Sequence, residues 1–304
     1  MHSGIFFLNK QSGITSFDAL RDIKRTLGTG KVGHTGTLDK FAQGLLIVLV
    51  GKALRLSQWF TNCDKKYIGK IHFGLETDTL DPEGDIIARA EVPSRDKVES
   101  VLNSFTGVIL QAPPAYSAIH INGKRASDLS RAGQVPEMKK REVTVYKLEL
   151  VSWEPPFGEI FVHCSSGTYI RSLARDIALA VESRGYLCAL ERTQIAGFEL
   201  GDEKMVEKGS LGDAKNAKEK KSEEERAKDI TLLPIDKSVI KKLGMPWYDV
   251  SAQEAKDIFH GKPLSPLASS ANNAAVFCED TLIAIIEKKE GKWKYGCVIN
   301  DTQK

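Results

Sequence analysis

The sequence predicts an α+β protein, with a mixed, mainly antiparallel sheet flanked by helices and a small β-rich C-terminal domain. Strand-like and helix-like stretches alternate irregularly and are joined by hairpin-length turns, which favours such a sheet over a doubly wound parallel one. A highly charged stretch interrupts the hydrophobic pattern after residue 200. The 304 residues suffice for about two domains at roughly 150 residues each.

The N-terminal part predicts a strand, a helix and a buried strand. An apolar strand at residues 5–9 precedes an amphipathic helix over 15–27, with Ser16 as its candidate N-cap and Gly28 after its last turn. The loop GTGKVGHTGTLDKFAQ then leads into GLLIVLVG, which is too short and too β-branched to prefer a helix. We expect Asp39 at the mouth of this core strand, and a helix in the KALRLSQWF that follows.

The middle of the chain predicts a sheet with two more helices. KKYIGKIHFG is typical of a strand, and DTLDPEGDIIARA of a turn followed by the partner of that strand. Helical spacing runs over residues 94–105 up to Gly107, and TYIRSLARDIALAVESRGY predicts an amphipathic helix ending at Gly185. Three further strands are expected in REVTVYKLELVSWE, GEIFVHCSS and LCALERTQIAGFEL.

The composition divides the chain into a first domain over residues 1–200, a charged linker over 201–230 and a second domain over 231–304. Apolar residues vanish in DAKNAKEKKSEEERAKD, which favours a solvated helix or flexible linker over a charge-mediated site. In SAQEAKDIFHG, Ser251 and Glu254 have capping-box spacing. Three short strands are expected after that helix, at residues 274–278, 282–287 and 292–299.

Charge and cysteine content restrict the class of protein. The net charge is only +3, so a nucleic-acid partner would need a local basic surface. The five cysteines are scattered and include no metal-ligand cluster, which favours a reducing compartment and no metal. No stretch approaches the ~18 apolar residues of a membrane span, and a signal peptide is not apparent. We therefore expect a cytoplasmic protein.

Asp39 is the first candidate functional residue. An aspartate before a strand is most often a turn or capping residue. Here, however, the two glycines of GHTGTLD allow the backbone to approach a ligand, and its histidine and threonines add polar groups that a core would not need. Tyr67 and Arg171 are further candidates, although a half-buried strand aromatic and a surface helix residue explain them about as well when each is judged alone.

Four segments together indicate a family. KVGHTGTLDKFAQGLLIVLVGKA, KKYIGKIHFGLETDTLDPEG, QAPPAYSAIHINGKRA and SSGTYIRSLARDIA closely resemble, in that order, the bacterial TruB-type tRNA pseudouridine synthases. The resemblance covers most of residues 4–200. It implies the pseudouridine synthase fold and isomerisation of uridine 55 in the T arm of tRNA. More weakly, it implies a PUA-like RNA-binding C-terminal domain.

The same resemblance implies roles for individual residues. Asp39 matches the catalytic aspartate, Tyr67 the active-site tyrosine that stacks on the target base, and Arg171 the arginine paired with that aspartate. The substrate-binding candidates are His34 near the flipped base, Leu190 lining the pocket, Gly36, Thr37 and Tyr169 in the matched motifs, and the expected phosphate contacts Lys65, Lys66, Lys124 and Arg125.

The chemistry of this isomerisation agrees with what the sequence contains. Breaking the C1′–N1 bond and rejoining the uracil through C5 consumes no cosubstrate, so we expect no cofactor. A glycoside hydrolase would need two cooperating carboxylates, whereas one suffices here. Asp39 either attacks C1′ or takes a proton from C2′. Either role needs an ionised carboxylate, which Arg171 would favour against the effect of burial.

Some residues depart from the pattern of the family, and two other functions stay open. Lys40 and Gln11 stand where proline is usual, which is expected to loosen the loop, and Ser127 stands where an aromatic residue is more common. A guide-RNA-directed enzyme is one alternative, but its signature usually has serine where this chain has Thr35. A tRNA-binding folding chaperone without turnover is the other. We expect a monomer that binds tRNA.

Overall fold

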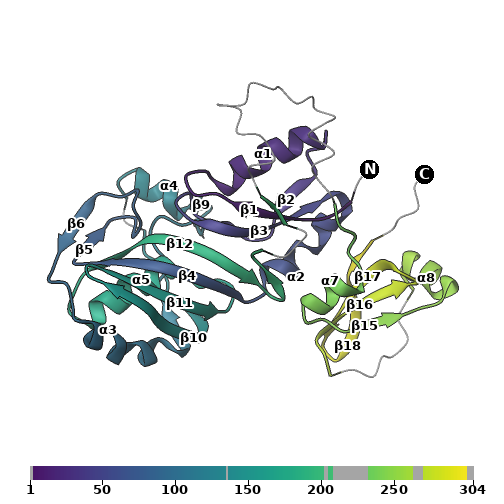
Figure 1. Cartoon of the computed structure of the whole chain (residues 1–304). Helices are drawn as coiled ribbons and strands as arrows, with labels where there is room; N and C mark the ends of the chain where they lie inside the picture. The colour runs from purple at the N-terminus through teal and green to yellow at the C-terminus, as the bar shows by residue number, and fades with distance from the viewer. Residues whose placement is uncertain (1–2, 135, 202–204, 208–231, 263–269, 300–304) are drawn as a thin grey trace.

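The computed structural model of the chain describes residues 3–134, 136–201, 205–207, 232–262 and 270–299. Figure 1 shows two units, a larger one built on a broad sheet and a smaller one that holds the C-terminal strands. Both units combine helices with β-sheet, as the sequence predicts. Among the described residues, no helix has the length and apolar character needed to cross a membrane.

The larger sheet is mixed and mainly antiparallel, which confirms the predicted fold class. Its strand β3 pairs in parallel with β12, and β1 with β14, while its other described pairings are antiparallel. The strand order is β14 (Met205–Glu207), β1 (Gly4–Lys10), β3 (Gln43–Val50), β12 (Gly185–Ile195), β4 (Lys65–Phe73), β11 (Phe157–Cys164), β10 (Arg141–Glu154) and β7 (Gly107–Gln111). Two short strands pair beside this path, β2 (Val32–His34) with β3 and β13 (Phe198–Glu199) with β12.

Strand β3 is buried on both faces, which explains its unbroken apolar sequence. Because side chains alternate along a strand, Leu45, Ile47 and Leu49 enter one apolar cluster. Leu46, Val48 and Val50 enter another, beneath helix α1 (Ser16–Thr26). The loop that contains Asp39 runs directly into this rigid strand.

One face of the sheet is covered by helices α3 (Arg95–Leu102) and α5 (Ile170–Ala180), as Figure 1 shows. Burial alternates along β4, so Lys65 and Tyr67 share the covered face with Ile71, whereas Lys66 lies on the other face. The apolar cluster between sheet and helices includes Tyr67 and Leu190 at one end. This end of the core adjoins the candidate site.

Helix α1 begins differently from the prediction. Its N-cap is Thr15, which forms a capping box with Asp18, so the assignment of Ser16 as the cap was wrong. Ser16 is the first helical residue, and its buried hydroxyl donates to the carbonyl of Leu38 (3.0 Å) and accepts from the Leu38 amide (2.9 Å). Serine and threonine are both good N-caps, so residue type alone does not show which of the two caps the helix. The hydroxyl of Ser16 is used by Leu38, which is distant in sequence, and Thr15 is the cap.

Three other local predictions were wrong in detail. KALRLSQWF forms a 3₁₀ turn, η1 (Gly51–Leu56), before the short helix α2 (Ser57–Thr61). Strand β6 (Ile86–Arg89) pairs with β5 (Leu75–Thr77) and not with β4. Helix α5 ends at Ala180, and Gly185 starts β12 instead of closing the helix.

The loop between β7 and β10 also contains short elements. Strands β8 (His120–Ile121) and β9 (Lys124–Arg125) form a hairpin, and helix α4 (Ala126–Arg131) follows it directly. The 3₁₀ turn η2 (Asn103–Phe105) extends α3.

The smaller unit has the predicted helix and strands. Its sheet has the order β15 (Trp247–Asp249), β16 (Asn273–Cys278), β17 (Thr281–Lys289) and β18 (Lys292–Val298). Helix α7 (Lys237–Lys242) precedes this sheet, and α8 (Ala252–Phe259) begins with the predicted capping box. An apolar cluster that includes Leu45, Phe60 and Phe277 joins the two units.

The predicted boundary between the first domain and the linker lies at residue 200. Strand β14, at residues 205–207, pairs with β1, so the larger sheet extends past residue 200. Most of the predicted linker 201–230 lies outside the described residues.

Candidate functional site

A cavity of about 490 Å³ lies where the Asp39 loop, β4, β12 and the start of α5 meet. Three of its lining residues, Tyr116, Ser117 and Ala118, come from the loop that follows β7. Nine of the twelve residues singled out in the sequence line this cavity: Gly36, Thr37, Asp39, Lys65, Tyr67, Arg125, Tyr169, Arg171 and Leu190. The chain therefore brings most of the candidates together from segments far apart in sequence.

Three candidates do not line this cavity. Lys66 lies on the opposite face of β4, next to residues that do line it. Lys124 lines a neighbouring hollow that it shares with Arg125. His34 ends β2, and its Nδ1 is buried without a hydrogen-bond partner. Burial, with a smaller contribution from Arg192, lowers the pKa of His34. As RNA contacts, all three stay predictions.

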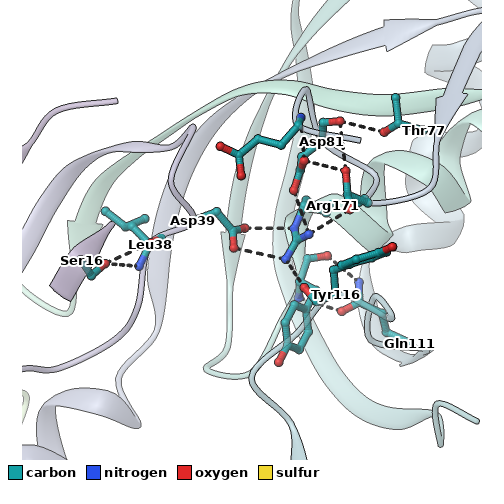
Figure 2. Close-up of polar contacts among 11 residues, drawn as sticks. Ser16, Leu38, Asp39, Thr77, Asp81, Gln111, Tyr116 and Arg171 are labelled. Atoms are coloured by element: carbon teal, nitrogen blue, oxygen red, sulfur yellow. Dashed lines mark hydrogen bonds and ion pairs between the residues drawn. The ribbon is translucent and has the colours of Figure 1, made fainter. Parts of the chain in front are cut away.

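The loop around Asp39 is fastened on both sides by residues 10–16. Before Asp39, Ser16 makes its two bonds to the backbone of Leu38 (Figure 2). After it, the Ser12 hydroxyl donates to the carbonyl of Phe41 (2.7 Å), and the Gly13 amide donates to the carbonyl of Lys40 (2.8 Å). On the side of the loop, all these bonds are made by backbone groups. They therefore do not depend on which side chain stands at position 40. The loop is therefore held even though proline is absent at position 40.

Gly36 and Arg192 fix the inner part of the loop. Gly36 has φ +141°, a conformation that favours glycine. Its carbonyl accepts a hydrogen bond from Nη2 of Arg192 (3.0 Å), while Nε of Arg192 donates to the carbonyl of Leu45 (2.8 Å). Arg192 is 1% exposed and is also hydrogen-bonded to the hydroxyl of Tyr67. This one buried side chain joins β12, the loop and β4.

Arg171 lies between two carboxylates, as Figure 2 shows. Its Nη2 donates to Oδ1 of Asp39 (3.2 Å), and its Nε lies 3.0 Å from Oδ2 of the same side chain. On its other side, Nη1 donates to Oδ2 of Asp81 (2.9 Å). The carbonyls of Thr79 and Tyr116 accept two further bonds, each 2.9 Å long. The guanidinium is thus held from four directions.

Asp81 was not predicted as a site residue, because DTLDPEGD by itself indicates only a turn. The turn does form: Oδ1 of Asp81 accepts bonds from the hydroxyl of Thr79 (2.7 Å) and the amide of Glu83 (3.0 Å). The other oxygen meets Arg171, and both side chains are almost fully buried. A buried guanidinium needs such a partner, but nothing local in the turn indicates that Asp81 provides it.

The start of α5, which carries Arg171, is positioned by Gln111 at the end of β7. The amide group of Gln111 accepts from the backbone N–H of Tyr169 (2.8 Å) and donates to the carbonyl of Tyr169 (3.1 Å). Arg141 lies over the Tyr169 ring, 5.8 Å from its centroid. Gln111 is nearly fully buried, so this two-point contact fixes the entry into the helix.

Burial in the cavity favours the neutral forms of Asp39 and Lys65. Burial raises the pKa of Asp39; Arg171 opposes this change, and Asp81 adds to it. The Asp39 side chain is 38% exposed, but protein surrounds the carboxylate in the cavity. Burial also lowers the pKa of Lys65 to about 8. Its ammonium group donates to the carbonyls of Thr61 and Cys63.

Tyr67 and Leu190 are among the apolar residues of the cavity wall. Burial raises the pKa of Tyr67, with Arg192 opposing the change, so the phenol is neutral at physiological pH. Within the residues that the structure describes, no group of three or more His, Cys, Asp or Glu side chains could hold a metal ion. The site thus combines one accessible carboxylate, its arginine and two apolar walls.

The fold of this chain is also found in solved structures that contain Cbf5. The chain aligns with the solved structure of a Cbf5–Nop10–Gar1 complex at a TM-score of 0.68 and 24% identity, over 99% of this chain and 84% of that one. The chain has the pseudouridine synthase fold.

Sequence comparisons narrow this class to one family. The model of the TruB family pseudouridylate synthase N-terminal domain matches residues 24–170. A tRNA pseudouridine synthase B of Borreliella burgdorferi (strain ZS7) is 44% identical over 210 residues, covering 68% of this chain and 74% of the relative. One of Treponema denticola is 35% identical, covering 96% of this chain and 97% of the relative. The chain belongs to the TruB family of pseudouridylate synthases.

Proposed function

We propose that this chain isomerises uridine 55 in the T arm of tRNA to pseudouridine. The single observation that carries the proposal is the Asp39 carboxylate, held by Arg171 in a cavity between Tyr67 and Leu190. The names of the relatives, tRNA pseudouridine synthase B, support the same activity. We propose further that residues 1–200 act as the catalytic domain and residues 231–304 as a PUA-like RNA-binding domain of a cytoplasmic monomer.

The cavity fits a single flipped-out nucleoside. Its volume of about 490 Å³ lies within the roughly 300–1,000 Å³ typical of small-ligand sites. A uridine stacked in an RNA loop must leave its stack before its C1′–N1 bond can be reached. The ring of Tyr67 offers a face for the uracil, and Leu190 provides a second apolar wall. Both would replace the stacking that the base loses.

Asp39 is the proposed catalytic group. It attacks C1′, or it removes a proton from C2′; in either case the C1′–N1 bond breaks and uracil leaves with the electron pair. The detached uracil turns and C5 bonds to C1′; this breaks the Asp39–C1′ bond in the first route, and in the second Asp39 returns the proton to C2′. C5 then loses its proton and N1 gains one. Arg171 holds the carboxylate and favours its charged form. Because no atoms are gained or lost overall, the reaction consumes no cosubstrate.

The function is tested by incubating the purified protein with an unmodified tRNA transcript and mapping pseudouridine chemically. We expect modification at position 55 alone. A transcript with cytidine at that position is the matched control and should remain unmodified. If the protein binds the transcript and forms no pseudouridine, the folding-chaperone alternative is favoured. Modification confined to other uridines would contradict the assignment of position 55.

The rate should fall in acid at a higher pH than an exposed aspartate would cause. Burial raises the pKa of Asp39 above its ordinary value, and protonation removes the lone pair that both mechanisms require. As the pH falls through this raised pKa, the active fraction is therefore lost. Single-turnover rates at saturating tRNA would measure the profile, with tRNA binding and circular dichroism followed in parallel. An acid limb at or below the ordinary pKa of aspartate would contradict the prediction.

A further inference from the structure

We propose that Lys40 binds a backbone phosphate of the substrate RNA beside the target nucleotide, and that Glu83 holds its ammonium group until the RNA replaces it. The proposal rests on the proposed function, since that function makes RNA the ligand. It concerns two residues that lie outside the lining of the catalytic cavity.

The first observation is an ion pair at the surface of the site. Nζ of Lys40 lies 2.9 Å from Oε1 of Glu83, and the two side chains are 51% and 45% exposed. Lys40 directly follows Asp39, and Glu83 belongs to the turn that contains Asp81. The pair therefore joins the two loops whose carboxylates share Arg171.

This ion pair closes a ring of contacts. Asp39 contacts Arg171, which contacts Asp81, and Asp81 accepts a bond from the backbone amide of Glu83. The side chain of Glu83 then meets Lys40, the neighbour of Asp39. The ring ties the partly exposed Lys40 side chain to the loop of the reacting carboxylate.

Substrate geometry brings a phosphate to the same place. In the proposed reaction, C1′ or the C2′ proton of the target ribose must touch Asp39. The phosphates of that nucleotide are joined to the ribose only a few bonds away, so at least one must lie near the residues next to Asp39. Arg171 cannot serve this phosphate, because two carboxylates and two carbonyls already surround its guanidinium. The flexible four-carbon stem of Lys40 can.

The present partner of Lys40 can be displaced. An ion pair between exposed side chains is weak and screened by salt. A phosphate of a folded RNA offers a full negative charge, and neutralising it releases condensed counterions. Glu83 raises the pKa of Lys40, so the ammonium group stays charged before the exchange. After the exchange, the Glu83 carboxylate is left near a phosphate and opposes binding.

The test measures tRNA affinity at several salt concentrations. Lys40→Ala should weaken binding several-fold and reduce the slope of log K against log salt by about one, whereas Lys40→Arg should restore both. Glu83→Gln should tighten binding, and less so in the Lys40→Ala background, because the two residues are coupled. At saturating tRNA, the single-turnover rate of Lys40→Ala should stay close to that of the wild type.

A second exposed ion pair provides the matched control. Lys97 and Glu182 are also 2.9 Å apart and exposed, and neither lines the cavity. Lys97→Ala and Glu182→Gln should therefore change neither the affinity nor the salt slope. This comparison separates a phosphate contact at Lys40 from the general effect of removing one surface charge.

Several results would overturn the proposal. Unchanged affinity and slope in Lys40→Ala, or weaker binding in Glu83→Gln, would make the pair a structural tether only. A slower rate at saturation with unchanged affinity would instead make Lys40 a positioning residue for Asp39. Failure of the proposed function is distinguishable, since it appears as absence of pseudouridine with the wild-type protein, whereas this proposal is decided by affinity.

Discussion

Asp39→Asn is expected to lower the rate of pseudouridine formation at least ~1000-fold, the scale commonly seen when an essential nucleophile or base is removed. Asparagine has almost the same shape, and its carbonyl oxygen can still accept the bond that Arg171 donates to Oδ1. It can neither attack C1′ nor usefully take a proton from C2′. Folding and tRNA affinity should therefore remain close to those of the wild type.

A single-turnover assay at saturating unmodified tRNA, beside a binding measurement, tests this prediction. Asp96→Asn removes a carboxylate in the first turn of α3, outside the cavity lining, and should leave the rate unchanged. If Asp39→Asn turned over within about tenfold of the wild type, the aspartate would be only a loop residue. Normal melting of the variant would exclude unfolding as the cause of a lost rate.

Arg171→Ala is expected to reduce both stability and rate. It leaves Asp81 buried without its cation and two part-buried carbonyls without this donor. Removing one partner of a buried ion pair costs about 3–5 kcal/mol. The rate at saturating tRNA should fall by at least about 100-fold, since the orientation and charge of Asp39 both depend on Arg171. Arg171→Lys should not restore it, because one ammonium group cannot reach both carboxylates and both carbonyls.

The double variant Arg171→Met with Asp81→Leu separates the two effects. Replacing both buried charges with apolar side chains removes the unpaired Asp81 carboxylate, so part of the lost stability should return, reduced by the loss of the two turn bonds that Asp81 accepts. The rate should stay low, because Asp39 still lacks its arginine. Denaturant unfolding and single-turnover rates measure the two quantities. If Arg171→Ala kept its rate at saturation and lost only tRNA affinity, Arg171 would belong to the binding surface.

The parts of the site that follow from local sequence were predictable. GLLIVLVG forms the buried strand β3, as its unbroken apolar sequence predicts. Asp39 lies in the loop that leads into this strand, so its place was predictable as well. The contact between Asp39 and Arg171 was expected from the family resemblance and is present at 3.0 Å. The roles of these residues in catalysis stay predictions.

The parts that depend on distant contacts were not predictable. One oxygen of Asp81 accepts a bond within its own turn, and the other accepts a bond from Arg171. Only the contact with Arg171 has a functional role in our proposal. Arg192 was missed because an arginine within a strand usually faces solvent, whereas this one is enclosed by β3 and the loop. One signal went unused: the alternation of β4 places Lys65 beside Tyr67 in the cavity and Lys66 on the opposite face.

The apolar cluster shared by the two units determines how the protein can lose its structure. Leu45 and Phe60 from the larger unit, and Ile240 and Phe277 from the smaller one, are all fully buried within it. Each unit has a further apolar cluster of its own, but separating the units would expose this shared surface on both. Because exposing apolar surface costs free energy, loss of one unit is expected to destabilise the other. Heat or denaturant that opens the C-terminal unit also uncovers one face of β3, the strand on which the position of Asp39 depends.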